Sequence, residues 1–167
     1  MKNIIPLLIA IIVLHVCCNR NHPDLSGKPL ENDTVTGIVL ADTIIYDVHL
    51  VNHNPDDHWA TQRLKNLNLK LMIDNVYEQV YSGQAQAFNH TTGEKLTVKQ
   101  VRELEQTSGL GRENVDMIQF REIWYMDPVD RSITKKVTAM VLGSQVYDSF
   151  GQYLANRAIM RVEFASN

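Results

Sequence analysis

The sequence predicts an α+β fold, in which an antiparallel sheet with a long C-terminal hairpin packs against two or three helices. Two patterns indicate this class. Apolar residues alternate with polar ones near both ends of residues 34–167, and they recur at helical spacing between those ends. Helices and antiparallel strands that are separated along the chain in this way are typical of α+β domains. With 167 residues, the chain is long enough to bury one core.

Residues 1–17 are expected to form a lipoprotein-type signal peptide. Residues 4–16 are an apolar run, which is shorter than the ~20 residues that a membrane-spanning helix needs. Cys17 and Cys18 follow the run, and either is a candidate for lipid attachment. Leu14 has the spacing to Cys17 that bacterial lipoproteins show, whereas Cys18 has the small preceding residue. The alternative is an ordinary cleaved signal, with which both cysteines are discarded.

A flexible tether is predicted for residues 18–33, and a single α+β domain for residues 34–167. The tether is polar, contains two prolines and one glycine, and has neither a helical nor a strand period. Because both cysteines precede the domain, we expect no disulfide, catalytic thiolate or cysteine-ligated zinc in it. The net charge of −3 is too weak to indicate binding to nucleic acid.

The first part of the domain predicts one strand and then helical structure. Apolar residues alternate with polar ones over residues 44–50, and Asn54-Pro55 ends this strand. Asp56 or Asp57 can cap the helix that follows. The helical spacing of apolar residues shifts phase after Leu69, which predicts a kink or a second helix.

The second part begins at Gly83, which is expected to end the helical region in a left-handed conformation. Residues 84–88 predict a short strand. Residues 97–100 match a capping box and therefore predict the start of a further helix. Residues 117–126 and 132–142 alternate on either side of a turn, and together they predict the long antiparallel hairpin.

The C-terminal segment predicts a short helix and a last strand. Tyr147, Phe150 and Tyr153 recur at every third residue, which favours a helix. Residues 158–164 are mainly apolar and include β-branched residues, which favours a final strand.

A metal site was considered where three histidines and three aspartates fall within residues 46–59. On a helix, His49 and His53 would share one face at zinc-binding spacing. His49 belongs to a predicted strand, however, where residues i and i+4 lie ~13 Å apart. We therefore predict a turn and no metal site, with His53, Asp57 and His58 as weak candidates if the loop folds back on itself.

No catalytic motif was found, so we expect neither an enzyme nor a cofactor. The hairpin is the predicted interaction surface. Its outer face carries Arg121, Tyr125 and Lys136 beside apolar residues, and Trp124 with Tyr125 forms an aromatic pair with one member inside and one outside.

Two segments resemble one protein family. Residues 71–104 end an apolar helix in a G-x-x-x-A-Y/F step and continue with an LT helix start. Residues 118–143 contain E-x-W-x-x-D, an R-S turn and a return strand. Both segments resemble the GldN/PorN proteins. The matching positions are Gly83, Phe88, Leu96, Thr97, Glu122, Trp124, Asp127, Arg131 and Ser132.

The resemblance implies a non-catalytic component of the cell envelope. GldN/PorN proteins are periplasmic partners of a ring-forming lipoprotein in the type IX secretion and gliding machinery of Bacteroidota. By this resemblance, we expect protein partners in an envelope assembly. The lipid anchor at Cys17 or Cys18 is expected from the signal sequence and is not implied by the resemblance. The alternative is a periplasmic lipoprotein that binds a small ligand or a metal.

Overall fold

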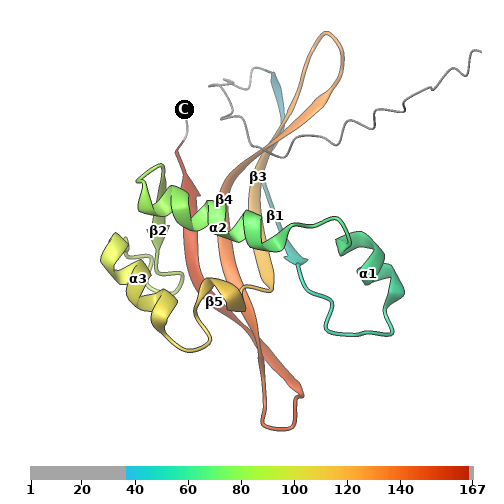
Figure 1. The fold of residues 1–167 in the computed structure, drawn as a ribbon. Helices are drawn as coiled ribbons and strands as arrows, with labels where there is room; N and C mark the ends of the chain where they lie inside the picture. Colours follow the sequence, from blue (N-terminus) through green and yellow to red (C-terminus); the bar gives the residue numbers. More distant parts are fainter. Residues whose placement is uncertain (1–36, 166–167) are drawn as a thin grey trace, which may run out of the picture. The chain divides into compact units, whose positions relative to one another are not determined.

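The computed structural model describes residues 37–165 (Figure 1). The predicted signal peptide, Cys17, Cys18 and the tether lie outside the described residues. Helices and strands follow one another as β1 (Ile38–His49), α1 (His58–Leu64), α2 (Leu69–Tyr81), β2 (Ala85–Phe88), α3 (Val98–Gln106), the 3-10 turn η1 (Arg112–Asn114), β3 (Met117–Met126), β4 (Ile133–Tyr147) and β5 (Tyr153–Phe164).

The five strands form one antiparallel sheet in the order β1-β3-β4-β5-β2. Strands β3, β4 and β5 are consecutive along the chain and pair as neighbours, so the predicted hairpin is the first two strands of a three-stranded meander. Together with the helices, this sheet confirms the predicted α+β class.

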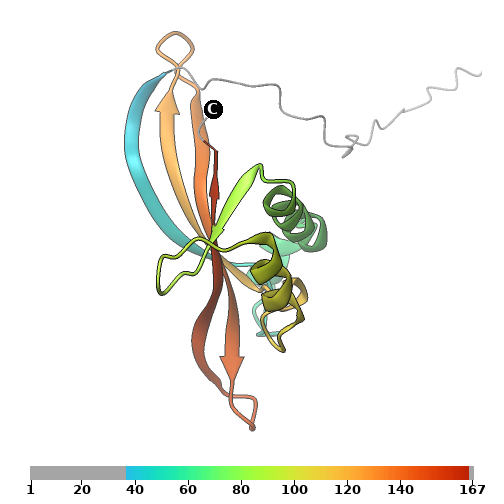
Figure 2. The same ribbon diagram turned by 90° about the vertical axis from the view of Figure 1, so that its left-hand side faces the viewer.

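One face of the sheet carries the hydrophobic core. Figure 2 shows α2 and α3 on the same side of the sheet. Alternate residues of the central strands point to these helices. The largest side chains that are almost fully buried are Tyr77, Val101, Ile118, Leu142, Met160 and Val162.

The helices begin where the sequence predicts capping. The Asp57 side chain accepts a hydrogen bond from the Ala60 backbone, and the Asn68 side chain caps the next helix in the same way. The structure has two separate helices, one of the two predicted alternatives, but the break lies at residues 65–68, before Leu69 rather than after it. Thr97 opens α3 with the predicted capping box. At the end of α2, Gly83 has a φ of +79°, the predicted left-handed conformation.

The predicted helix around Tyr147, Phe150 and Tyr153 is wrong. Strands β4 and β5 extend to these residues and form a second hairpin, which projects beyond the helices (Figure 2). Asp148 sets the turn, because its side chain accepts hydrogen bonds from the backbone N–H groups of Phe150 and Gln152. This local bonding, which fixes an extended turn, replaces the helical pattern.

Candidate interaction surface

The outer face of the sheet holds three of the four residues predicted to contact a partner. Within residues 37–165, no helix covers this face (Figure 2). Arg121 and Tyr125 lie four positions apart in β3, and Lys136 pairs with Ile123 between them. Because side chains alternate along a strand and paired residues share a face, these three residues and Ile123 point to the same face. Arg121 is exposed, and the other three are partly buried.

A β-bulge beside Arg121 shapes this surface. Arg121 pairs with Ala139, but the next residue, Glu122, pairs with Val137, so Thr138 is the extra residue of β4. The Thr138 hydroxyl donates a hydrogen bond of 3.1 Å to the Arg121 carbonyl oxygen. Bulges bend a strand and increase its twist. The bulge therefore curves the hairpin at the position of the exposed cation.

A hollow of about 230 Å³ opens next to the bulge. It is smaller than the ~300 Å³ at which pockets for drug-sized ligands begin. The lining residues are Asp42, Thr43, Arg121, Ile123, Thr138, Ala139, Glu163 and Phe164.

Trp124, the fourth predicted contact residue, belongs to the opposite face. Its indole N–H donates a hydrogen bond of 2.9 Å to the Glu122 carboxylate. The Lys135 ammonium lies 4.2 Å from the centre of its ring, a cation–π contact. Trp124 therefore has partners within the hairpin, and the predicted set of four is divided between the two faces of the sheet.

Glu122 is a buried carboxylate that ties β1 to β3. It accepts a hydrogen bond of 2.8 Å from the Tyr46 hydroxyl, and the Tyr46 ring stacks on Phe120. Burial, followed by the hydrogen bond to Glu122 and its charge, raises the pKa of Tyr46 to about 12. Tyr46 therefore stays a neutral donor at physiological pH.

The turn between β3 and β4 is fixed by its own side chains. Asp127 accepts hydrogen bonds from the backbone N–H groups of Val129 and Asp130, and Asp130 accepts one from Ser132. The bond from the Ser132 backbone lowers the pKa of Asp130 below its ordinary value. Arg131 has a φ of 65°, the left-handed conformation that closes the turn. The D-x-x-D-R-S sequence thus has a structural role here.

The weak metal candidates have separate roles. His53 Nε2 lies 3.2 Å from the Asp116 carboxylate, which also accepts the Gln145 backbone N–H. Asp57 caps α1, and His58 is the exposed first residue of that helix. Among residues 37–165, no group of three or more His, Cys, Asp or Glu side chains is arranged to hold a metal ion.

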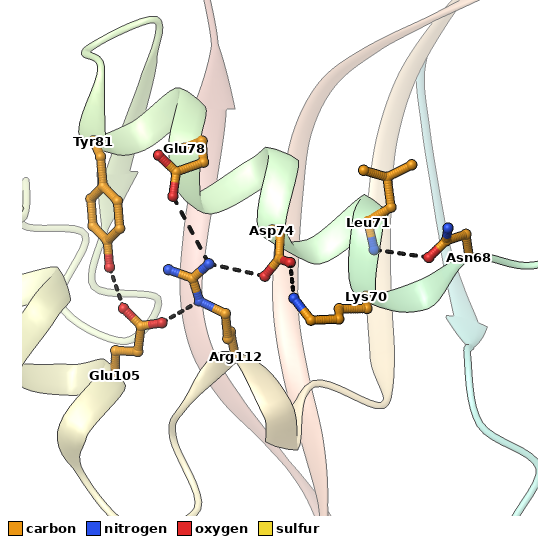
Figure 3. A network of polar contacts seen from close by, with 8 residues as sticks. All are labelled: Asn68, Lys70, Leu71, Asp74, Glu78, Tyr81, Glu105 and Arg112. Carbon is orange, nitrogen blue, oxygen red and sulfur yellow. Dashed lines mark hydrogen bonds and ion pairs between the residues drawn. The ribbon is translucent and has the colours of Figure 1, made fainter. Parts of the chain in front are cut away.

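Sequence reasoning missed a polar network centred on Arg112, which joins η1 to α2 and α3 (Figure 3). Its guanidinium donates to Glu105 and, at 2.9 Å, to Asp74. It also lies 4.7 Å from the centre of the Tyr77 ring. Tyr81 donates its hydroxyl hydrogen to Glu105. The sequence separations are too varied for a local pattern to reveal this network.

The fold is thus an antiparallel sheet with helices on one face. No helix of the described residues is long and apolar enough to cross a membrane. A scan against protein-family models found no match to this chain, and a search of curated proteins found none either.

Proposed function

We propose that this chain is a non-catalytic protein of the cell envelope, periplasmic or lipid-anchored, that docks on a larger secretion or gliding-motility assembly. The partner protein binds to the outer face of the β3–β4 hairpin. Neither a cofactor nor a nucleic acid takes part in this function.

The observation that carries the proposal is the difference between the two faces of the sheet. One face is packed against helices, whereas the other presents Arg121, Tyr125 and Lys136 beside a small hollow. Arginine and tyrosine are enriched among the residues that contribute most to binding between proteins. A rigid sheet also presents them with little loss of conformational entropy on binding.

The GldN/PorN resemblance supports the secretion or gliding context. Its matching positions in the hairpin are Glu122, Trp124, Asp127, Arg131 and Ser132. In this structure, Trp124 bonds to Glu122, Asp127 and Ser132 bond within the turn, and Arg131 takes the left-handed conformation that closes it. Proteins that share these five residues would share the shape of the hairpin. The residues on the outer face of the hairpin would differ between them according to the partner.

The experiment is a pull-down of the tagged full chain from envelope membranes in a mild detergent, followed by mass spectrometry. We expect components of a secretion or motility complex to be retained. Tyr125→Ala is expected to lose them, because it truncates the aromatic side chain on the outer face. Trp59→Ala is the matched control, since Trp59 is an exposed aromatic residue on α1. A complex that survives Tyr125→Ala contradicts docking through this face.

A further inference from the structure

The free edge of β1 is a second surface, next to the outer face of the hairpin. β1 is the first strand in the sheet order, and β3 is the element with which it makes extensive contact. In Figure 1, α1 lies on this side beyond the C-terminal end of β1, but it makes no extensive contact with the strand. The edge of a sheet exposes backbone N–H and C=O groups with which another strand can pair.

The register identifies which backbone groups point outward. Leu50, the residue that follows β1, donates its N–H to the carbonyl oxygen of Asp116, the residue that precedes β3. Along an antiparallel strand these groups alternate between the two sides. Residues 44–49 pair with β3 without irregularity. The N–H groups of Ile45, Asp47 and His49 therefore point away from β3, to the free edge.

Residues 44–49 of this edge lack several of the usual protections against pairing. Proteins commonly protect edge strands with lysine, proline or bulges. β1 contains no lysine, arginine or proline, and its two bulges precede Ile44. Several large apolar side chains are exposed along it, and Ile45 has an exposed fraction of 58%. The regular half of β1 is thus free to accept a strand that covers this apolar surface.

The charges of β1 indicate what kind of strand fits. Asp42 and Asp47 are exposed, and they are the carboxylates of β1. Asp47 accepts one hydrogen bond from Gln119, which leaves further acceptor positions free. Opposite charges that face each other across two strands stabilise the pair, and like charges destabilise it. A partner strand with lysine or arginine opposite Asp47 is therefore favoured.

We propose that an extended strand of a partner protein, carrying lysine or arginine, pairs with β1 along residues 44–49. This inference rests on the proposed docking function and adds the manner of docking, which is strand addition to the sheet edge. A second copy of this chain is a poorer occupant, because two β1 strands would bring four carboxylates and no lysine or arginine to their shared edge.

The probe is a nine-residue peptide in which valine alternates with lysine, and its control replaces each lysine with glutamate. Binding to the purified chain is measured by fluorescence anisotropy, and amide hydrogen exchange locates the bound peptide. We expect the basic peptide to bind and to slow exchange at Ile45 and Asp47. Equal binding of both peptides, or slowed exchange confined to other strands, overturns the inference.

Two variants test the edge itself. Ile45→Pro removes an outward N–H and is expected to weaken binding of the basic peptide by about tenfold or more. Asp47→Lys leaves the backbone intact and is expected to weaken it by about three- to tenfold, with a preference for the acidic peptide. Unchanged binding in Asp47→Lys, which does not depend on tolerance of proline, overturns the role of charge and with it the proposed partner.

The pull-down separates this inference from the proposed function. If the wild-type chain retains its partners and Ile45→Pro retains them equally, strand addition is overturned while docking stands. If the wild-type chain retains no partner, docking itself is overturned. Sedimentation of the purified chain tests whether a second copy of the chain pairs with β1 instead. A dimer that Ile45→Pro converts to a monomer would show that it does, and would overturn the proposed partner.

Discussion

The two halves of the sheet differ in how their side chains are used. Towards β5 and β2, residues on the inner face are buried against α2 and α3, and Val162 and Ala87 have no measurable exposure. Towards β1, large apolar side chains remain exposed on an edge strand, and charged residues stand on the outer face. The side of the sheet towards β5 and β2 therefore carries most of the buried core, and the side towards β1 is the part available to the proposed partner.

The largest expected effect compares two isoleucines on opposite sides of this division. Ile118 is fully buried under the helices, so Ile118→Ala is expected to lower the free energy of unfolding by about 3 kcal/mol. Ile45 is mostly exposed, so Ile45→Ala is expected to change it by less than about 0.5 kcal/mol. Urea denaturation of both variants measures the difference. Equal losses would mean that β1 is packed as firmly as the centre of the sheet.

The network around Arg112 is expected to contribute next. Arg112→Met leaves the partly buried carboxylate of Glu105 without its paired cation, which costs about 2 kcal/mol of stability, whereas Asp74 keeps its pair with Lys70. Lys70→Met is the matched control, because the Lys70 side chain is largely exposed and its ion pair with Asp74 is screened by solvent, so little loss of stability is expected. Thermal unfolding compares them. A similar decrease in melting temperature in both variants would contradict a larger contribution of Arg112 to stability.

The same network predicts how stability depends on pH. Hydrogen bonds from Lys70 and Arg112 lower the pKa of Asp74. Burial acts to raise the pKa of Glu105, but hydrogen bonds from Arg112 and Tyr81 outweigh it and lower that pKa. Both carboxyls thus ionise at lower pH in the folded chain than in the unfolded chain. Their stabilisation is fully present above the ordinary carboxyl pKa of about 4 and is lost as pH falls through the folded-state pKa values.

The measurement is urea denaturation from about pH 6 down to about pH 2, the range over which such carboxyls are protonated. The wild-type chain is expected to lose stability more steeply than Arg112→Met, because the variant has lost the main cause of the depressed pKa of Glu105. Parallel curves would contradict the coupling between Arg112 and these carboxyls.

A smaller effect distinguishes the two faces of the hairpin. Trp124→Phe removes the hydrogen bond to the buried Glu122 and is expected to lower stability by about 1–2 kcal/mol, without loss of the partner. Tyr125→Ala is expected to show the reverse, with partner loss and little change in stability. Chemical denaturation and the pull-down are applied to both. Loss of the partner from a folded Trp124→Phe variant would place the contact on the inner face.

Local signals explain how much of this fold the sequence could predict. Asp57, Gly83 and Thr97 act within a few residues of their own position, so the ends of the helices follow from the sequence. The β3–β4 hairpin follows from two alternating segments around a polar turn. The β4–β5 hairpin was mistaken for a helix, because three aromatic residues have helical spacing and the bonding of Asp148 is not visible in that spacing.

Contacts between distant segments were beyond such reasoning. The pairing of β1 with β3 and of β2 with β5 sets the edges of the sheet, yet no local pattern specifies which strands become neighbours. For the candidate surface, alternation along β3 placed Arg121 and Tyr125 on one face. It also set Trp124 on the other face, but its partners Glu122 and Lys135 became known only from the structure.

The most direct test of the account is amide hydrogen exchange on the full chain, measured alone and in its isolated complex. Partner binding is expected to slow exchange at the free edge of β1 and in the bulged part of the β3–β4 hairpin, while exchange in α2 and α3 stays unchanged. Slowed exchange confined to the helices, with β1 and the hairpin unaffected, would contradict it.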